Sequence, residues 1–335
     1  MHCTQLPARC PRQAGCDPWP VSCVDAAAPP FRQQERLPAM SQLLASAPCR
    51  PLVEARNILG EGPVWDDAEG CLWWVDIVGA ELHRLRLADE AHDSWPMPER
   101  VAALALREEG GLVLALASGF ARFNAATGAV VPYPERLPLR RGQRLNDGGC
   151  DHSGRFWCGA MREEGEEADA ALHVLQPVGS LLEHPVGLRI INCVNWSPDG
   201  GAMYFSDTPA GIIYACDFDA ATGRMGERRV FHDGKDVPGQ PDGGTVDAEG
   251  CLWSARFGGG GVARFRPDGS LDGFLPLPAQ KITCCAFGGP ELRTLFITSA
   301  TEGLSGEEKQ AQPLAGRLMA LEPGVAGRLP RRFAG

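Results

Sequence analysis

Short apolar runs rich in aromatic and β-branched residues recur along the chain from about residue 57 onward. Each run is preceded by a turn-forming segment, and no stretch has the apolar stripe of an amphipathic helix. Runs of this length between turns predict β-strands. The clearest predicted strands are 72–77, 112–116, 155–160, 202–207, 251–256 and 294–298.

The spacing of these six runs predicts the architecture. They recur about every 40 to 50 residues, which is typical of propeller blades, each a four-stranded sheet that cannot bury its faces alone. A two-sheet sandwich predicts no constant period, and solenoid repeats of this length are usually helical. We therefore expect an all-β, six-bladed β-propeller over residues 49–335, with further strands at 81–85, 120–123, 212–216, 262–265 and 317–321.

The first 48 residues lack this periodicity. They contain many Pro, Ala, Arg and Gln residues and no continuous apolar stretch that would serve as a signal peptide. A small zinc site is one interpretation of their four cysteines, but spacings of six and seven residues match no usual zinc pattern. We expect a disordered or non-native extension over residues 1–48. Residues 1–39 could lie upstream of the true start, because Met40 is a plausible first residue.

The composition and charge of the chain limit the kinds of partner that the protein is expected to bind. A hydrophobic share of 44% and a charged share of 22% are globular values, and no apolar stretch is long enough to span a membrane. The net charge of -10 disfavours nucleic acid and anionic membranes, which need clustered Lys and Arg. The 13 cysteines are scattered, odd in number and without a C-x-x-C pair, so a reduced, cytoplasmic protein is expected. A small-molecule ligand and a monomer or weak oligomer are the corresponding predictions.

Four segments repeat one pattern, in which a polar residue stands five positions before an Asp or Ser that opens a turn. The segments are 61–66, 146–151, 192–197 and 242–247, and their first residues are Glu61, Asn146, Asn192 and Asp242. Equivalent positions in a circular repeat lie close in space, so these side chains should meet at the central channel. The corresponding positions of the other two blades carry Ala102 and Ile282, so the polar groups should occupy one side of the channel.

Glu61, Asn192 and Asp242 offer only oxygen ligands of the kind that calcium, magnesium and manganese prefer, with iron(II) and zinc also possible. Two converging carboxylates without a cation would repel each other, so a bound metal would resolve the repulsion. The alternative is that Glu61 and Asp242 cap turns by accepting hydrogen bonds from backbone amides.

Arg144 and Asn146 are two residues apart on a predicted strand, so both can face the channel while Asp147 points to the opposite face. A guanidinium and an amide suit a polyhydroxylated or anionic substrate, although Arg144 could instead form a plain salt bridge. The charged segment 162–167 should be a loop at the channel mouth, from which one carboxylate could cover a bound substrate.

The chain resembles the gluconolactonase family that includes regucalcin (senescence marker protein). The matching motifs are 59–65, 75–77, 144–148, 206–207, 241–243, 287–289 and 313–316, and the segment 298–316 resembles bacterial sugar-lactone hydrolases of that family. The resemblance implies one catalytic divalent cation with Glu61, Asn192 and Asp242 as ligands, and Asp242 also as general base. It further implies substrate contacts from Arg144, Asn146 and Glu164. Cys193 departs from the family's usual Gly and could crowd the metal.

Together these observations predict a metal-dependent hydrolase that opens aldonolactones, of the gluconolactone, xylonolactone or arabinonolactone type, to aldonic acids. Two alternatives stay open at this point. One is a non-catalytic propeller that binds a ligand or partner. The other is a different propeller hydrolase, similar to paraoxonase or strictosidine synthase.

Overall fold

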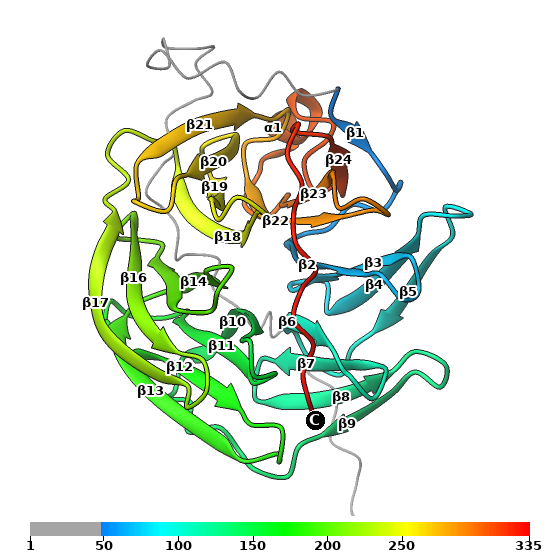
Figure 1. The fold of residues 1–335 in the computed structure, drawn as a ribbon. Coiled ribbons are helices and arrows are strands. Elements are labelled where there is room, and N and C mark those ends of the chain that lie inside the picture. Colours follow the sequence, from blue (N-terminus) through cyan, green and yellow to red (C-terminus); the bar gives the residue numbers. More distant parts are fainter. Residues whose placement is uncertain (1–47) are drawn as a thin grey trace, which may run out of the picture. The chain divides into compact units, whose positions relative to one another are not determined.

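The computed structural model describes residues 48–335, and the predicted N-terminal extension lies almost entirely outside them. Six four-stranded antiparallel sheets surround a central channel, as predicted (Figure 1). The first blade consists of β2 (Gly60–Asp66), β3 (Cys71–Asp76), β4 (Glu81–Arg86) and β5 (His92–Pro96). The second consists of β6 (Val101–Leu106), β7 (Leu112–Leu116), β8 (Phe120–Asn124) and β9 (Ala129–Pro132). The third consists of β10 (Gln143–Cys150), β11 (Phe156–Arg162), β12 (Ala170–Leu175) and β13 (Leu181–Leu188). The next two are β14 (Ile191–Trp196), β15 (Ala202–Asp207), β16 (Ile212–Asp219), β17 (Arg224–His232); and β18 (Gln240–Val246), β19 (Leu252–Phe257), β20 (Gly261–Phe265), β21 (Leu271–Pro276).

The sixth blade combines both ends of the described chain. It consists of β22 (Ile282–Gly288), β23 (Thr294–Ser299), β24 (Met319–Leu321) and β1 (Arg50–Pro51), in which β1 pairs antiparallel with β24. The sequence predicted β23 and β24 and an inner-strand position at Ile282. It did not predict β1, whose two residues are too few to show a periodicity. This pairing fastens the sixth blade to the segment that leads into the first, and so closes the ring.

A buried aspartate at the turn after the innermost strand stabilises two of the blades. Asp151 Oδ2 accepts a hydrogen bond of 2.9 Å from the indole Nε1 of Trp157, and Asp247 Oδ2 accepts the same bond from Trp253. Both carboxylates also accept backbone N–H bonds of the turn and pair with an arginine, Arg155 or Arg264. The aspartates that open the repeated turns therefore have a structural role, because buried carboxylates need such partners.

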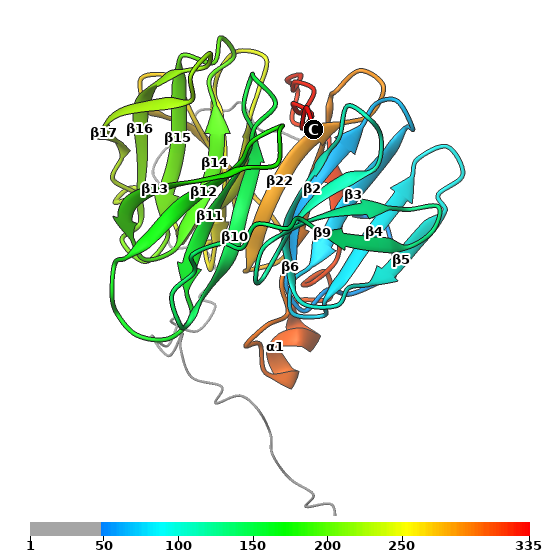
Figure 2. The ribbon, with the colours of Figure 1, turned by 90° about the horizontal axis from the view of Figure 1, so that it is seen from below.

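The two ends of the channel are covered differently. The connection between β23 and β24 carries the short helix α1 (Gly306–Ala311), and Figure 2 places α1 and the C-terminus at opposite ends of the propeller. No helix of residues 48–335 is long and apolar enough to span a membrane. Residue Thr301 of the same connection donates its backbone N–H to Ile58, just before β2, so the inner strands begin at the end that carries α1.

The C-terminal strap, residues 322–335, crosses the other end of the channel. Its backbone bonds to the fifth blade at Ala248, to the second at Leu106 and to the third at Gly154, and the side chain of Arg332 pairs with Asp66 and Asp67 of the first blade. Phe333 is fully buried in the core shared by the first three blades. The strap therefore links blades that do not neighbour one another.

Candidate active site

Each inner strand is irregular at its predicted functional residue. Pairing with the next strand shifts register between Glu61 and Val64 in β2, and the same irregularity recurs at the equivalent point of β10, β14 and β18. Such β-bulges increase the local twist and re-aim side chains. They direct successive residues, which would otherwise alternate between faces, toward the channel.

The two predicted carboxylates, Glu61 and Asp242, come together in the channel. Glu61 and Asp242 are both buried, and their carboxyl groups interact directly. Burial, followed by the charges of Asp242 and Asp147, raises the pKa of Glu61 well above its usual value, and burial and Asp147 raise the pKa of Asp242 in the same way. The pair therefore holds a proton in the absence of a counter-charge.

The turn-capping alternative describes only part of this geometry. Glu61 Oε2 accepts a bond of 2.9 Å from the backbone N–H of Gly62, and Asp242 accepts one from Gly243. One amide for each carboxylate does not balance two adjacent buried charges. A divalent cation would, and two carboxylates, with the amide oxygen of Asn192 as the predicted third ligand, suit a hard cation. The residues present therefore fit the predicted metal.

A chain of hydrogen bonds connects the other predicted residues across three blades. Arg144 Nη1 donates to Asn146 Oδ1 at 2.9 Å, and Asn146 Nδ2 donates to Asn192 Oδ1 at 2.8 Å. Asn192 Nδ2 then donates to Thr208 Oγ1 at 2.8 Å, and this hydroxyl donates to the carbonyl of Pro241, the residue before Asp242. Thr208 thereby fixes which end of the Asn192 amide is oxygen. The sequence analysis missed Thr208, which carries no motif.

Arg144 and Asn146 lie on the same face, as predicted. Arg144 also forms a salt bridge, which was the alternative interpretation of this residue. Its Nε donates at 3.1 Å to Glu163, in the loop after β11. The structure brings Glu163 rather than Glu164 to this arginine. Glu164 is exposed, and its role as a substrate contact stays a prediction.

The prediction that Asp147 points away from the channel is wrong. Its side chain lines the channel cavity, and its Oδ2 accepts a bond of 2.8 Å from the backbone N–H of Val194 in the next blade. The bulge between Leu145 and Gly148 breaks the alternation on which that prediction depended. Burial raises the pKa of Asp147 to about 6.

Cys193 has a left-handed backbone conformation, and its side chain is directed toward the next blade. It is fully buried with a φ of 57°, a left-handed conformation that favours Gly and costs other residues about 1 kcal/mol or more. Its thiol points toward the backbone of Gly244 in the next blade, where a Cβ would lie 3.0 Å from the sulfur. The missing side chain at Gly244 therefore gives Cys193 its space.

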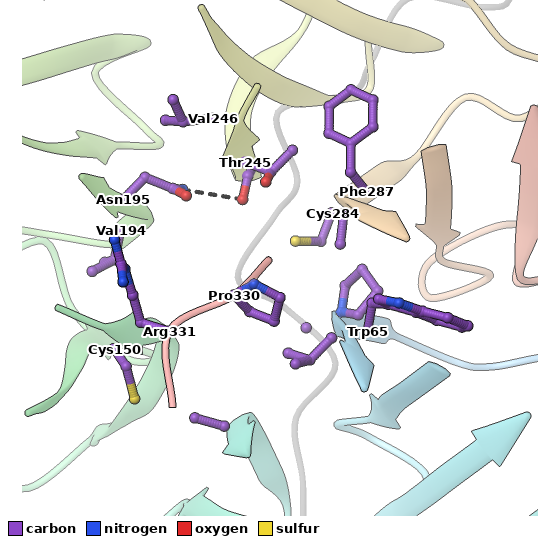
Figure 3. A pocket seen from close by; sticks show the side chains of 18 of the residues that line it. Trp65, Cys150, Val194, Asn195, Thr245, Val246, Cys284, Phe287, Pro330 and Arg331 are labelled. Carbon is purple, nitrogen blue, oxygen red and sulfur yellow. Dashed lines mark hydrogen bonds between the residues drawn. The ribbon is translucent and has the colours of Figure 1, made fainter. Parts of the chain in front are cut away.

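A cavity of about 150 Å³ lies behind this site, toward the strap. All six inner strands line it, and Pro330 and Arg331 of the strap cross it (Figure 3). The cavity does not include Glu61, Asn146, Asn192 or Asp242 among its lining residues. The predicted site therefore lies at the end of the channel that carries α1, and the strap covers the other end.

Two further acidic groups lie in turns at the strap end. They consist of Asp66, Glu69 and Cys71, and of Asp247, Glu249 and Cys251, with ligand atoms within 4.8 Å of one another. Arginines already neutralise both: Arg332 pairs with Asp66, and Arg264 with Asp247 and Glu249. These groups therefore need no cation, unlike the Glu61 and Asp242 pair.

Comparison with known proteins agrees with this geometry. Residues 59–301 match the SMP-30/Gluconolactonase/LRE-like region. The chain belongs to this family. It is 37% identical over 304 residues to the L-arabinolactonase of Azospirillum brasilense, covering 88% of this chain and 99% of the relative. It is 35% identical to the 6-deoxy-6-sulfogluconolactonase of Pseudomonas putida, covering 85% and 98%.

Solved structures of SMP-30/gluconolactonase family members have the same propeller. The calcium-binding protein regucalcin from Agrobacterium tumefaciens aligns with a TM-score of 0.80 and 33% identity, covering 87% of this chain and 98% of that one. A gluconolactonase from Xanthomonas campestris aligns with a TM-score of 0.66 and 26% identity, covering 82% and 89%. The expected class of enzyme, a lactone-opening carboxylic-ester hydrolase, is thus confirmed at the level of the family.

Proposed function

We propose that this protein hydrolyses sugar aldonolactones to aldonic acids with the help of one divalent cation. The observation that carries the proposal is the buried contact between Glu61 and Asp242, two carboxylates that form no salt bridge with an arginine of residues 48–335. Relatives that are named as arabinolactonase and sulfogluconolactonase support a sugar lactone as the substrate class.

Glu61, Asn192 and Asp242 would hold the cation. Bound there, a divalent cation would polarise the lactone carbonyl and stabilise negative charge on its oxygen. The Agrobacterium relative, which is described as a calcium-binding protein, makes calcium the first cation to try, and magnesium, manganese, zinc and iron(II) are the others. The Thr208 hydroxyl keeps the Asn192 amide oxygen turned toward Asn146 and the channel.

Asp242 is the proposed general base. Its carboxylate takes a proton from the attacking water, the oxygen of that water bonds to the lactone carbonyl carbon, and the bond from this carbon to the ring oxygen breaks. The proton then passes to the ring oxygen, which becomes a hydroxyl of the open acid. Glu61 remains a ligand throughout and does not transfer the proton.

Arg144 and Asn146 are the proposed substrate-binding pair. The Oδ1 of Asn146 accepts from Arg144 and keeps a second lone pair for a sugar hydroxyl. Because Arg144 is buried and fixed by three bonds, it can donate to a hydroxyl without losing side-chain entropy. Glu164 is retained as a predicted contact from the loop above them.

Proton release from a panel of pentonolactones and hexonolactones tests the proposal, with metal-stripped protein and single cations added back. We expect hydrolysis above the spontaneous rate only when a cation is present. Asp242→Asn should lower kcat by about 10²- to 10⁴-fold, the usual contribution of a general base. Folded protein that accelerates no lactone with any of these cations would refute the proposal.

A further inference from the structure

A second arginine stands behind the substrate-binding pair. Arg100 lies just before β6, and its guanidinium contacts Glu163 with two nitrogens, Nη1 to Oε1 at 2.5 Å and Nη2 to Oε2 at 2.9 Å. The same Oε1 accepts from Nε of Arg144 at 3.1 Å. One carboxylate is thus held between guanidinium groups of two neighbouring blades.

This arrangement keeps Glu163 ionised and fixes its position. Burial alone would raise the pKa of Glu163, but the hydrogen bonds and charges of Arg100 and Arg144 lower it. A two-nitrogen contact restricts the carboxylate to one plane, which a single-point contact from Lys would not do. About 27% of the Glu163 side chain remains exposed, so the carboxylate is held in place but can still be reached from the mouth.

The position of Glu163 determines which nitrogen of Arg144 is available. Arg144 uses Nε for Glu163 and Nη1 for Leu145 and Asn146, while Nη2 has no hydrogen-bond acceptor among residues 48–335. Without Arg100, the Glu163 carboxylate would be free to rotate onto both Nε and Nη2 of Arg144, the favoured two-point geometry. The nitrogen offered to substrate would then be occupied.

We infer that Arg100 is a positioning residue for substrate specificity. By holding Glu163, it leaves a fixed donor on Arg144 beside a fixed acceptor on Glu163, a pair that matches adjacent hydroxyl groups of a sugar lactone. The inference rests on the proposed function and adds to it the residue that sets the preference for hydroxylated over unsubstituted lactones.

A purely structural role for Arg100 predicts something different. The side chains of Arg100 and Glu163 are 31% and 27% exposed, and ion pairs with such exposure contribute little to folding stability. If the pair served only to join two blades, its loss would lower stability slightly and would affect all substrates equally.

The test compares D-glucono-1,5-lactone with δ-valerolactone, which has the same ring without hydroxyl groups. For Arg100→Gln we expect a rise in KM for gluconolactone of about tenfold, as for a weakened hydrogen bond to a charged group, with kcat within about twofold. The rate with δ-valerolactone should change by less than about twofold. Arg100→Lys should recover only part of the loss, because it restores the charge without the planar fork.

A matched control and a double variant complete the design. Arg189→Gln removes an ion pair to Glu166 in the same loop without contacting Arg144, and it should leave kcat and KM unchanged for both lactones. Glu163→Gln combined with Arg100→Gln should be no worse than Glu163→Gln alone, because Arg100 acts through Glu163. Equal losses on both lactones, or additive losses in the double variant, would overturn the inference.

A failure of the inference about Arg100 can be distinguished from a failure of the proposed lactonase function. If the parent protein hydrolyses no lactone, the proposed function fails, and the role of Arg100 is then measured by binding of D-gluconate, which carries the same hydroxyl groups. About tenfold weaker gluconate binding by Arg100→Gln, with cation affinity unchanged, would still support the inference. Unchanged gluconate binding would reject it.

Discussion

The carboxyl groups of Glu61 and Asp242 come from the inner strands of the first and fifth blades and interact at a buried position in the channel. Both have pKa values raised chiefly by burial, so the pair takes up a proton that a cation would have to displace. Cation affinity should therefore increase as pH rises through the range in which this proton is lost.

Calorimetry in buffers of different ionisation enthalpy measures the protons released when the cation binds. We expect proton release with the parent protein, and at least about tenfold weaker cation binding with Glu61→Gln, in which one charged ligand is lost. Cation affinity that is constant between pH 5 and 8 would contradict the assignment of this pair as ligands.

Thr208 orients Asn192 through a single hydroxyl. Replacing it with the similarly shaped Val leaves Asn192 Nδ2 without its acceptor and frees the amide to turn. Partners that orient a metal ligand are typically worth about 10- to 100-fold in metal affinity, and we expect a loss of this size for Thr208→Val. Thr301→Val is the control, since this hydroxyl also donates to a backbone carbonyl, that of Asn57, outside the chain of bonds that reaches Asn192. Equal cation affinity in the two variants would argue against the role of Thr208.

Phe333 anchors the C-terminal strap in the core and lies edge-on to Tyr133. Truncating a fully buried Phe typically costs about 3 to 5 kcal/mol of folding free energy, and we expect Phe333→Ala to lower stability by this amount in urea unfolding. Leu329→Ala, in the same strap but 46% exposed, should cost far less. Cation affinity should be unchanged in both, because the strap covers the end of the channel away from Glu61 and Asp242. Weaker cation binding by Phe333→Ala would show that the strap also supports the site.

Stability should fall in mild acid because two histidines are buried uncharged. Burial lowers the pKa of His173 to about 4, and burial together with His92 lowers that of His83 to about 4. The unfolded chain binds these protons at a pKa of about 6.5, so the stabilising contribution is complete above that pH and is lost as pH falls from about 6.5 toward 4.

Each of these histidines can contribute up to about 3 kcal/mol to this loss, because its pKa falls from about 6.5 in the unfolded chain to about 4 in the fold. Urea unfolding at pH 7.5, 6 and 5 measures it. In His173→Leu, the loss of unfolding free energy between pH 7.5 and 5 should be smaller, by up to half of the part that the two histidines contribute. A decline as steep as that of the parent protein would mean that His173 is already protonated in the fold.

Much of the fold could be predicted because a propeller repeats its own signals. The run 202–207 coincides with β15 and the run 112–116 with β7, since turns and apolar residues mark both ends of these strands. The two-residue strand β1 could not be predicted, because its pairing with β24 depends on ring closure and not on any local pattern.

The convergence of Glu61 with Asp242, and of Asn146 with Asn192, was predictable because these positions repeat from blade to blade, while their chemical roles stay predictions. Residues that act through these were not predictable. Thr208 and Arg100 each occur at one blade only. Their proposed roles follow from contacts between blades, of Thr208 with Pro241 and of Arg100 with Glu163, that no spacing along the chain reveals. Asp147 was misplaced because strand alternation fails at a bulge.

The closure of the sixth blade by β1 and β24 also dictates an order of events during synthesis. The first five blades can form one after another as the chain leaves the ribosome, since each contains consecutive strands. The ring itself stays open until β24 has emerged, and until then the first and fifth blades expose faces that later become interior. A nascent chain at that stage presents apolar surface and unpaired strand edges to the cell, so the final few dozen residues decide whether the whole protein escapes aggregation.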